Sequence, residues 1–242
     1  MVDLTERQIQ VLKSIIEEYI ETAESVGSET LDKKYNLGVS PATIRSEMVK
    51  LTKAGYLRQS YTSAGRMPTS LALKYYVKNL MKPHELSVAE EVAMKEKIWD
   101  YREEFDRLLR ESIKALAQKT KALSLATTDE GEIYYSGTAN ILEMPEFFDI
   151  DLTKSVFSFL DRFDFWEEIV GKAIENEDPI HLLLGNELGE YLTPCGFIYT
   201  HYQAGPKHGA IGVVGPERLN YPVIIPVVGY FGRLINDIGK SW

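Results

Sequence analysis

The sequence has a single cysteine, Cys195, among its 242 residues. A disulfide framework within the chain is therefore excluded, and a lone thiol suits the reducing cytoplasm, where we expect this protein to reside. No apolar run approaches the ~20 residues that a membrane-spanning helix needs. Residues 1–6 have neither the basic nor the apolar region of a signal peptide. These absences exclude disulfide-stapled secreted proteins and argue against a membrane protein.

Residues suited to catalysis or metal binding are also scarce, because the chain has only four histidines. Cys195 has His181, His201 and His208 near it in sequence. A cysteine beside apolar residues is usually a small buried hydrophobe, and the spacing of His201 and His208 is not that of a metal site. We therefore expect no enzyme activity, no metal and no cofactor. A Cys–His nucleophile pair stays open as an alternative, since it requires a spatial proximity that sequence does not reveal.

The charge is distributed unevenly along a chain long enough for one large or two modest domains. The whole sequence carries a net charge of −9. Residues 25–82 nevertheless contain ten Lys and Arg against three acids, whereas the residues from Pro83 onward contain 15 basic and 27 acidic side chains. A positive segment on an acidic protein is typical of a surface that contacts phosphate.

Residues 1–82 have the pattern of a winged helix-turn-helix domain. Thr5 and Gln8 form a capping box before a helix with apolar side chains on one face. Ser40 followed by Pro41 begins a later helix, which Gly55 ends. A short hairpin comes next, and this order of helices and hairpin places one helix in the DNA major groove and a basic loop beside it.

The helix that begins at Ser40 divides into two faces when its residues are spaced by 100°. Ile44, Met48 and Leu51 fall together and are predicted to face the core. The remaining side chains are small and polar near the start and basic further along, as in a helix that contacts bases and then phosphates. Its candidate DNA-binding residues are Ser40, Ala42, Thr43, Arg45, Ser46, Lys50 and Lys53. An ordinary solvated helix face is the alternative.

The hairpin supplies the second part of the predicted DNA-binding surface. Residues 56–59 favour a strand, and the turn that follows combines hydroxyls, small side chains and a cation. Small residues let the backbone approach a phosphate, while Arg66 can enter the minor groove or pair with the backbone. The candidate residues here are Thr62, Ser63, Gly65 and Arg66. A plain surface hairpin is the alternative, but helix and wing together favour DNA binding.

Residues 83–124 are predicted to form a long connecting helix. Ser87 and Glu90 make a capping box, and the helix could continue from Val88 to about Leu123. Phe105, Leu109 and Leu116 keep approximate heptad positions, so they are candidates for a dimer seam. The alternative, equally weighted, is a helix that packs on its own domain.

Residues 125–242 change to short apolar strands alternating with helices. Strands are predicted at 123–127, 132–136, 181–184, 196–201 and 210–214, and helices at 152–162, 166–174 and 223–238. The chain as a whole is thus predicted to be α+β, with a winged-helix domain, a connecting helix and an α/β domain.

Several motifs resemble the HrcA family of bacterial heat-inducible transcription repressors. They are Ser-Pro-Ala-Thr-Ile-Arg-Ser-Glu-Met at 40–48, Thr-Ser-Ala-Gly-Arg-Met-Pro-Thr at 62–69, Gly-Thr-Ala-Asn-Ile-Leu-Glu-Met-Pro-Glu-Phe at 137–147, and Gly-Pro-Glu-Arg-Leu-Asn-Tyr-Pro at 215–222. The sequence departs from the family pattern at Ser46, where asparagine is usual, and at Ser60-Tyr61, where proline-histidine is usual. The family's middle section is collapsed to a few residues near 127–131.

The resemblance implies a shortened GAF-like domain in residues 125–242, which would serve regulation and dimerisation. It implies a homodimer that binds double-stranded DNA at the inverted-repeat operator called CIRCE, upstream of chaperone operons. It also implies that the chaperonin GroEL keeps the repressor active. A winged-helix regulator that senses a small metabolite through the GAF-like half is the alternative function.

Overall fold

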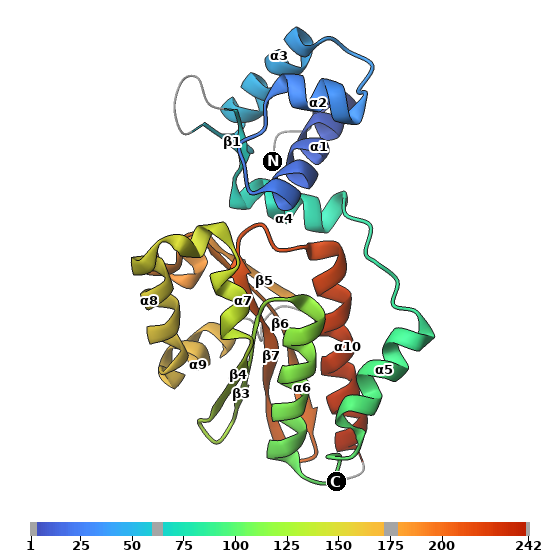
Figure 1. Ribbon diagram of the computed structural model, residues 1–242, viewed down its shortest axis with the longest axis vertical. Helices are drawn as coiled ribbons and strands as arrows, with labels where there is room; N and C mark the ends of the chain where they lie inside the picture. Colours follow the sequence, from blue (N-terminus) through green and yellow to red (C-terminus); the bar gives the residue numbers. More distant parts are fainter. Residues whose placement is uncertain (1–3, 60–64, 172–178, 241–242) are drawn as a thin grey trace. The chain divides into compact units, whose positions relative to one another are not determined.

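The computed structural model describes residues 4–59, 65–171 and 179–240. The chain divides into two compact units, Met1–Lys82 and Pro83–Trp242. Figure 1 colours the first unit from blue to teal and the second from green to red. Helices and strands occur in both units, which confirms the predicted α+β class. No helix formed by the described residues is both long and apolar enough to cross a membrane.

The first unit consists of helices and a two-stranded hairpin, in the order of a winged helix-turn-helix. The Thr5–Gln8 capping box starts its first helix as predicted, and Leu12, Ile15 and Ile16 of that helix are fully buried. The two strands pair antiparallel, with Leu57 opposite Pro68. Its elements are α1 (Glu6–Thr22), α2 (Ser28–Tyr35), α3 (Pro41–Lys53), β1 (Leu57–Arg58), β2 (Met67–Pro68) and α4 (Ser70–Asn79).

The second unit is built on a five-stranded antiparallel sheet with the strand order β4-β3-β7-β6-β5. The strands are β3 (Leu123–Thr128), β4 (Ile133–Ser136), β5 (His181–Leu184), β6 (Cys195–Ala204) and β7 (Lys207–Pro216). The helices are α5 (Val88–Trp99), α6 (Phe105–Thr120), α7 (Thr138–Leu142), α8 (Ile150–Leu160), α9 (Phe163–Gly171) and α10 (Tyr221–Gly239), with short 3-10 helices at Pro145–Phe148, Gly185–Leu188 and Glu190–Leu192. All five predicted strands therefore form, each within a few residues of its predicted range.

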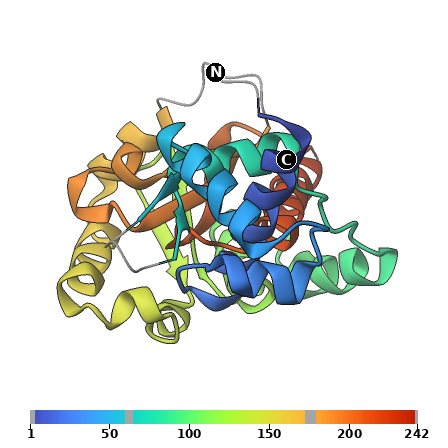
Figure 2. The ribbon, with the colours of Figure 1, turned by 90° about the horizontal axis from the view of Figure 1, so that it is seen from above.

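Helices lie on both faces of this sheet, and β3 is buried along its whole length, whereas the edge strand β4 is only partly buried. Alternate residues of β6 point to opposite faces. Phe197 packs against Trp166 of α9, with ring centroids 5.1 Å apart, while Tyr202 packs against Phe105 of α6 at 6.1 Å. Figures 1 and 2 show α8 and α9 on one side of the sheet and α6 and α10 on the other.

The prediction of one continuous helix from Val88 to Leu123 is wrong. Residues 100–104 form tight turns, in which the backbone N–H groups of Tyr101 and Arg102 bond to carbonyls three residues back. The chain then reverses, and α5 packs on α6: the Lys119 ammonium lies 2.7 Å from the Glu90 carboxylate. Both helices belong to the second unit, so the segment is part of the α/β domain.

Packing explains the break, because the turn itself contains neither glycine nor proline. Met94 and Ile98 of α5 are buried, and a straight helix would carry them away from α6, on which α5 packs. The fold-back also lets the Tyr230 hydroxyl of α10 donate to the Glu91 carbonyl at 2.7 Å. Burial of two apolar side chains contributes roughly 3–6 kcal/mol, which outweighs the few helical hydrogen bonds lost at the turn.

Candidate nucleic-acid interface

Two of the predicted DNA-contacting residues hold the first turn of α3. The Ser40 hydroxyl accepts from the Thr43 backbone N–H at 3.3 Å, and the two hydroxyl oxygens lie 3.0 Å apart. Pro41 occupies the first helical turn, where its missing N–H leaves nothing unsatisfied. The sequence thus fixes the start of α3, and with it the direction of every side chain along the helix.

The two faces of α3 are those predicted from the sequence. Ile44, Met48 and Leu51 are buried at 4% exposure or less. The opposite face is open to solvent and runs the length of the helix. Its exposed residues are Ala42, Arg45, Ser46, Val49, Lys50 and Lys53.

Val49 is a member of this face that the sequence reasoning missed. Its side chain is 39% exposed, which is unusual for a β-branched apolar residue. Positions 42, 46, 49 and 53 are spaced by four, three and four, so they form one stripe on a helix. That spacing is visible in the sequence, and it places Val49 in the middle of the exposed stripe.

The three cations of α3 differ in their surroundings. Lys50 donates to the Glu47 carboxylate at 2.8 Å, and Glu47 itself is buried with its second oxygen unpartnered among the described residues. Neither Arg45 nor Lys53 has an ion pair within the described part of the chain. Part of the Lys50 charge is thus balanced internally, whereas Arg45 and Lys53 present theirs to solvent.

The hairpin formed by β1 and β2, which we call the wing, is hydrogen-bonded to the rest of the first unit through Val26. The backbones of Val26 and Arg66 exchange hydrogen bonds of 2.9 and 2.8 Å. A Cβ on Gly65 would lie 2.6 Å from the Val26 carbonyl oxygen, so only glycine fits here. The predicted contacts Thr62 and Ser63 lie outside the described residues.

Arg66 joins the wing to α3. Its Nε donates to the Thr52 hydroxyl at 3.1 Å, and Thr52 in turn donates to the Met48 carbonyl at 2.8 Å. The Arg66 side chain is half-buried by this arrangement. It therefore lies beside the C-terminal half of α3, close to the exposed cations of that helix.

The residues proposed for a dimer seam lie elsewhere than expected. Phe105, Leu109 and Leu116 are 9%, 0% and 0% exposed, respectively, within the second unit itself. Their heptad spacing reflects the face of α6 that packs on β3, β4 and α10. The seam prediction is therefore corrected: the alternative, a helix packed on its own domain, describes α6.

The motif at 137–147 contains residues of α7 that are hydrogen-bonded to the C-terminal end of α6 and the residues just after it. Gly137 has φ +85°, and a Cβ there would lie 2.6 Å from the Ala122 carbonyl oxygen. The Asn140 side-chain amide donates to that carbonyl at 3.1 Å and to the Ala117 carbonyl at 3.4 Å. The Ala117 carbonyl also accepts the Lys121 backbone N–H, so the Asn140 amide adds a second bond there and one to Ala122 just beyond α6, and the motif has a structural role.

The motifs at 137–147 and 215–222 meet at an ion pair. The Arg218 guanidinium contacts the Glu146 carboxylate twice, with Nε–Oε1 2.5 Å and Nη2–Oε2 3.0 Å. The two side chains are 14% and 18% exposed. A bidentate, mostly buried pair of this kind is geometrically specific.

Cys195 does not have the surroundings of a nucleophile. Its side chain is fully buried, and burial, together with the nearby carboxylates of Glu217 and Glu146, raises the pKa of the thiol to about 12. The thiolate is the reactive form of cysteine, so this thiol stays protonated and inert near neutral pH. The geometry gives no support to the Cys–His alternative.

Comparisons with known proteins agree with the sequence resemblance. Residues 68–225 match the family model described as the HrcA protein C-terminal domain. The heat-inducible transcription repressor HrcA of Symbiobacterium thermophilum is 26% identical over 339 residues, with 98% of this chain and 99% of that protein covered. The protein of the same name from Desulforamulus reducens is 27% identical over 332 residues, with 95% of each covered.

The length of these alignments indicates that the relatives carry residues with no counterpart here, because 339 aligned positions exceed the 242 residues of this chain. β3 and β4 are joined by a tight turn, in which the Gly131 N–H donates to the Thr128 carbonyl. The family's middle section, which is shortened in this chain, is predicted at this turn.

A crystal structure of a hypothetical protein has the same fold, with a TM-score of 0.76 at 18% identity over 99% of both chains. The family model matches more than half of the sequence. On that match, this chain belongs to the HrcA family.

Proposed function

We propose that this protein is a cytoplasmic, homodimeric transcription repressor that binds an inverted-repeat operator of the CIRCE type upstream of chaperone operons. The observation that carries the proposal is the exposed face of α3, with Arg45 and Lys53 presented to solvent beside the Arg66 wing. Relatives that carry the name heat-inducible transcription repressor add support. The GroEL chaperonin is proposed to maintain the active form, as the family resemblance implies.

The face of α3 suits the major groove because its small residues come first. Ala42 and Ser46 allow close approach to base edges, and the exposed Val49 side chain can contact a thymine methyl group. Lys50 and Lys53 then lie where the helix leaves the groove and meets phosphates. Serine at position 46 reaches less far than the family's usual asparagine, so we expect a weaker preference for adenine at that contact.

An inverted repeat requires a two-fold protein, since each α3 reads one half-site. The buried side chains of α6 cannot form that interface without unfolding the second unit. We therefore propose pairing through another surface of the chain. Light scattering of the full chain at micromolar concentration is expected to give the mass of a dimer.

The proposal is tested by a gel shift with the full chain on an inverted-repeat operator, with and without GroEL and ATP. We expect retardation that is lost on a scrambled sequence and is increased by the chaperonin. Binding of equal strength to the scrambled sequence would contradict the repressor function. Regulation by a small metabolite is the second candidate, which the cavity beside β6 favours.

Arg45→Ala is expected to weaken operator binding by about 1–3 kcal/mol, because it removes an exposed cation from the groove-facing side of α3. Fluorescence anisotropy with labelled operator measures the loss. Lys13→Ala is the matched control, since Lys13 is a half-exposed α1 lysine paired with Glu17 at 3.8 Å. Equal losses in both variants would show that α3 is not the reading helix.

Arg66→Ala is expected to weaken binding to specific and scrambled DNA alike and to flatten the slope of log K against log salt by about one unit. Thr52→Val is the control, because it removes the partner of the Arg66 Nε while keeping the charge and the side-chain volume. The salt slope of Thr52→Val should equal that of the wild type. A loss of sequence preference in Arg66→Ala at an unchanged salt slope would contradict a phosphate contact.

A further inference from the structure

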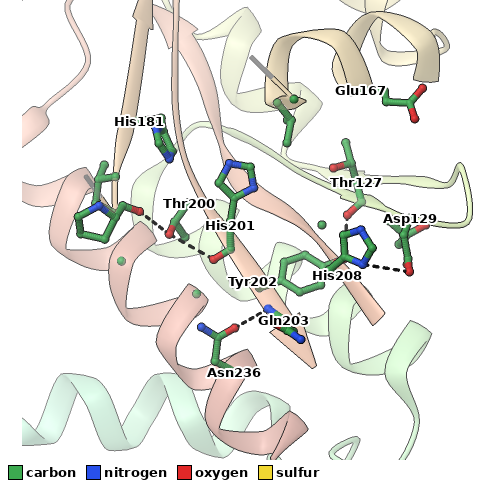
Figure 3. Close-up of a pocket in the computed structure, with 18 of the residues that line it drawn as sticks. Thr127, Asp129, Glu167, His181, Thr200, His201, Tyr202, Gln203, His208 and Asn236 are labelled. Carbon is green, nitrogen blue, oxygen red and sulfur yellow. Dashed lines mark hydrogen bonds and ion pairs between the residues drawn. The ribbon is translucent and has the colours of Figure 1, made fainter. Parts of the chain in front are cut away.

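Four buried side-chain atoms have no hydrogen-bond partner among the described residues, and they belong to Glu47, Ser112, Ser124 and His201. His201 lies on β6 beside the cavity between β6, α9 and α10, which Figure 3 shows. Burial first, and then the neighbouring His181, lower the pKa of His201, so its ring is neutral near neutral pH. Glu47 is the only carboxylate of the four, and it lies on α3, the helix with the exposed face that is proposed to contact DNA.

The Glu47 carboxylate depends on a single partner. Its side chain is 8% exposed, and Oε1 accepts from the Lys50 ammonium at 2.8 Å. The described part of the chain gives this carboxylate no ion pair or hydrogen bond other than the one to Lys50. Lys50 itself is 56% exposed, so the pair joins a buried oxygen to an ammonium at the surface. Burying a carboxylate is costly unless it is paired, so Glu47 requires this contact.

The pair limits where the Lys50 ammonium can go. A surface lysine ordinarily moves on its flexible stem and can follow a phosphate. If Lys50 left Glu47, a buried carboxylate would remain unpaired, and loss of one partner from a buried pair is strongly destabilising. Of the three N–H donors of the ammonium, one serves Glu47 and two remain for other acceptors. Arg45 and Lys53, which have no ion pair within the described residues, are not constrained in this way.

We infer that Glu47 is a positioning residue for operator recognition: it holds the Lys50 ammonium at one place beside α3, where Lys50 contacts a phosphate only when the helix lies in its operator register. This role rests on the proposed DNA-binding function and gives it a source of selectivity. Non-specific binding consists of cation–phosphate contacts that adjust to any duplex. A cation that cannot adjust adds little to such binding but adds a full contact at the operator, so the ratio of the two affinities rises.

The test measures binding of the full chain to a labelled inverted-repeat operator and to a scrambled duplex, by fluorescence anisotropy over a series of salt concentrations. Glu47→Gln keeps the shape of the side chain but removes its charge, so Lys50 can move to the nearest phosphate on any DNA. We expect this variant to bind scrambled DNA about threefold to tenfold more tightly at ~0.1 M salt, with a slope of log K against log salt that is steeper by about one unit. Operator affinity should change less, so the ratio of operator to scrambled affinity falls.

The double variant Glu47→Gln with Lys50→Gln has the net charge of the wild type and leaves no buried charge without a partner. Its affinity ratio should also fall, here because operator binding is about threefold to tenfold weaker without the Lys50 contact. If Glu47 acted only through its charge, the single variant would gain equally on both duplexes and the ratio would stay constant in both variants. That result, or weaker binding of both duplexes by Glu47→Gln, would overturn the role of Glu47. Circular dichroism melts verify that each variant is folded.

Glu29→Gln is the matched control, because Glu29 is an exposed acid on α2 of the same unit with no ion pair within the described residues. Its affinity ratio should equal that of the wild type, which separates the release of Lys50 from a general change in charge. A wild-type protein that binds both duplexes equally would overturn the proposed function together with the role of Glu47. A wild-type preference for the operator that every variant retains in full would overturn the role of Glu47 alone.

Discussion

Leu109→Glu is expected to unfold the second unit rather than to separate a dimer into folded monomers. Leu109 is fully buried between α6 and the sheet. Removing its side chain costs about 2–5 kcal/mol in lost packing, and burying an unpaired carboxylate costs several kcal/mol more. The sum approaches the whole stability of a typical domain, which is about 5–15 kcal/mol. Circular dichroism melts of the full chain measure the loss of folded structure. Size-exclusion chromatography measures whether the protein elutes as a dimer or a monomer.

Val92→Glu is the control for this experiment, because Val92 lies on α5 of the same unit and is 47% exposed. Its melt should stay within about 0.5 kcal/mol of the wild type. A Leu109→Glu protein that melts like the wild type but elutes as a monomer would restore α6 to the subunit interface. Loss of the second unit's transition confirms the internal role instead.

The reversal between α5 and α6 shows where sequence reasoning fails in this chain. Residues 100–104 carry no helix breaker, and Phe105, Leu109 and Leu116 continue an apolar stripe that reads as one long helix. The prediction that these side chains form one buried face is confirmed, since all three are buried. The turn lets α5 pack on α6 with Met94 and Ile98 buried, and no local sequence pattern encodes such a tertiary contact.

Helix α3 shows the opposite case. Its cap, its proline and its buried side chains lie close together in the sequence, so helical spacing predicts the buried face correctly, although the exposed Val49 is missed. The contact between Arg66 and Thr52 joins residues 14 apart in sequence, and spacing along one helix cannot predict it. The same holds for the cavity, which gathers His201 and Glu167 from separate elements.

The ion pair between Glu146 and Arg218 joins residues 72 apart in sequence. The two motifs that contain them were recognised from their residues, but their meeting was not predicted. The pair connects the 3-10 helix after α7 to the segment before α10. These two segments of the second unit are therefore joined by a contact between two charges that have little access to water.

Arg218→Met is expected to destabilise the second unit by about 2–4 kcal/mol, because it leaves the Glu146 carboxylate buried without its partner. Arg162→Met is the matched control: Arg162 pairs with Asp164 at 3.1 Å, but the two side chains are 54% and 75% exposed. An exposed pair contributes at most about 1 kcal/mol. Urea unfolding of the full chain measures both changes.

The double variant Arg218→Met with Glu146→Gln decides whether the loss comes from an orphaned charge. With both charges gone, nothing is left unpaired, so the double variant should lose less free energy of unfolding than the two single variants combined. Additive losses would instead mean that Arg218 and Glu146 act independently through their packing. In that case Arg162→Met and Arg218→Met would differ only by the apolar contacts of their side chains.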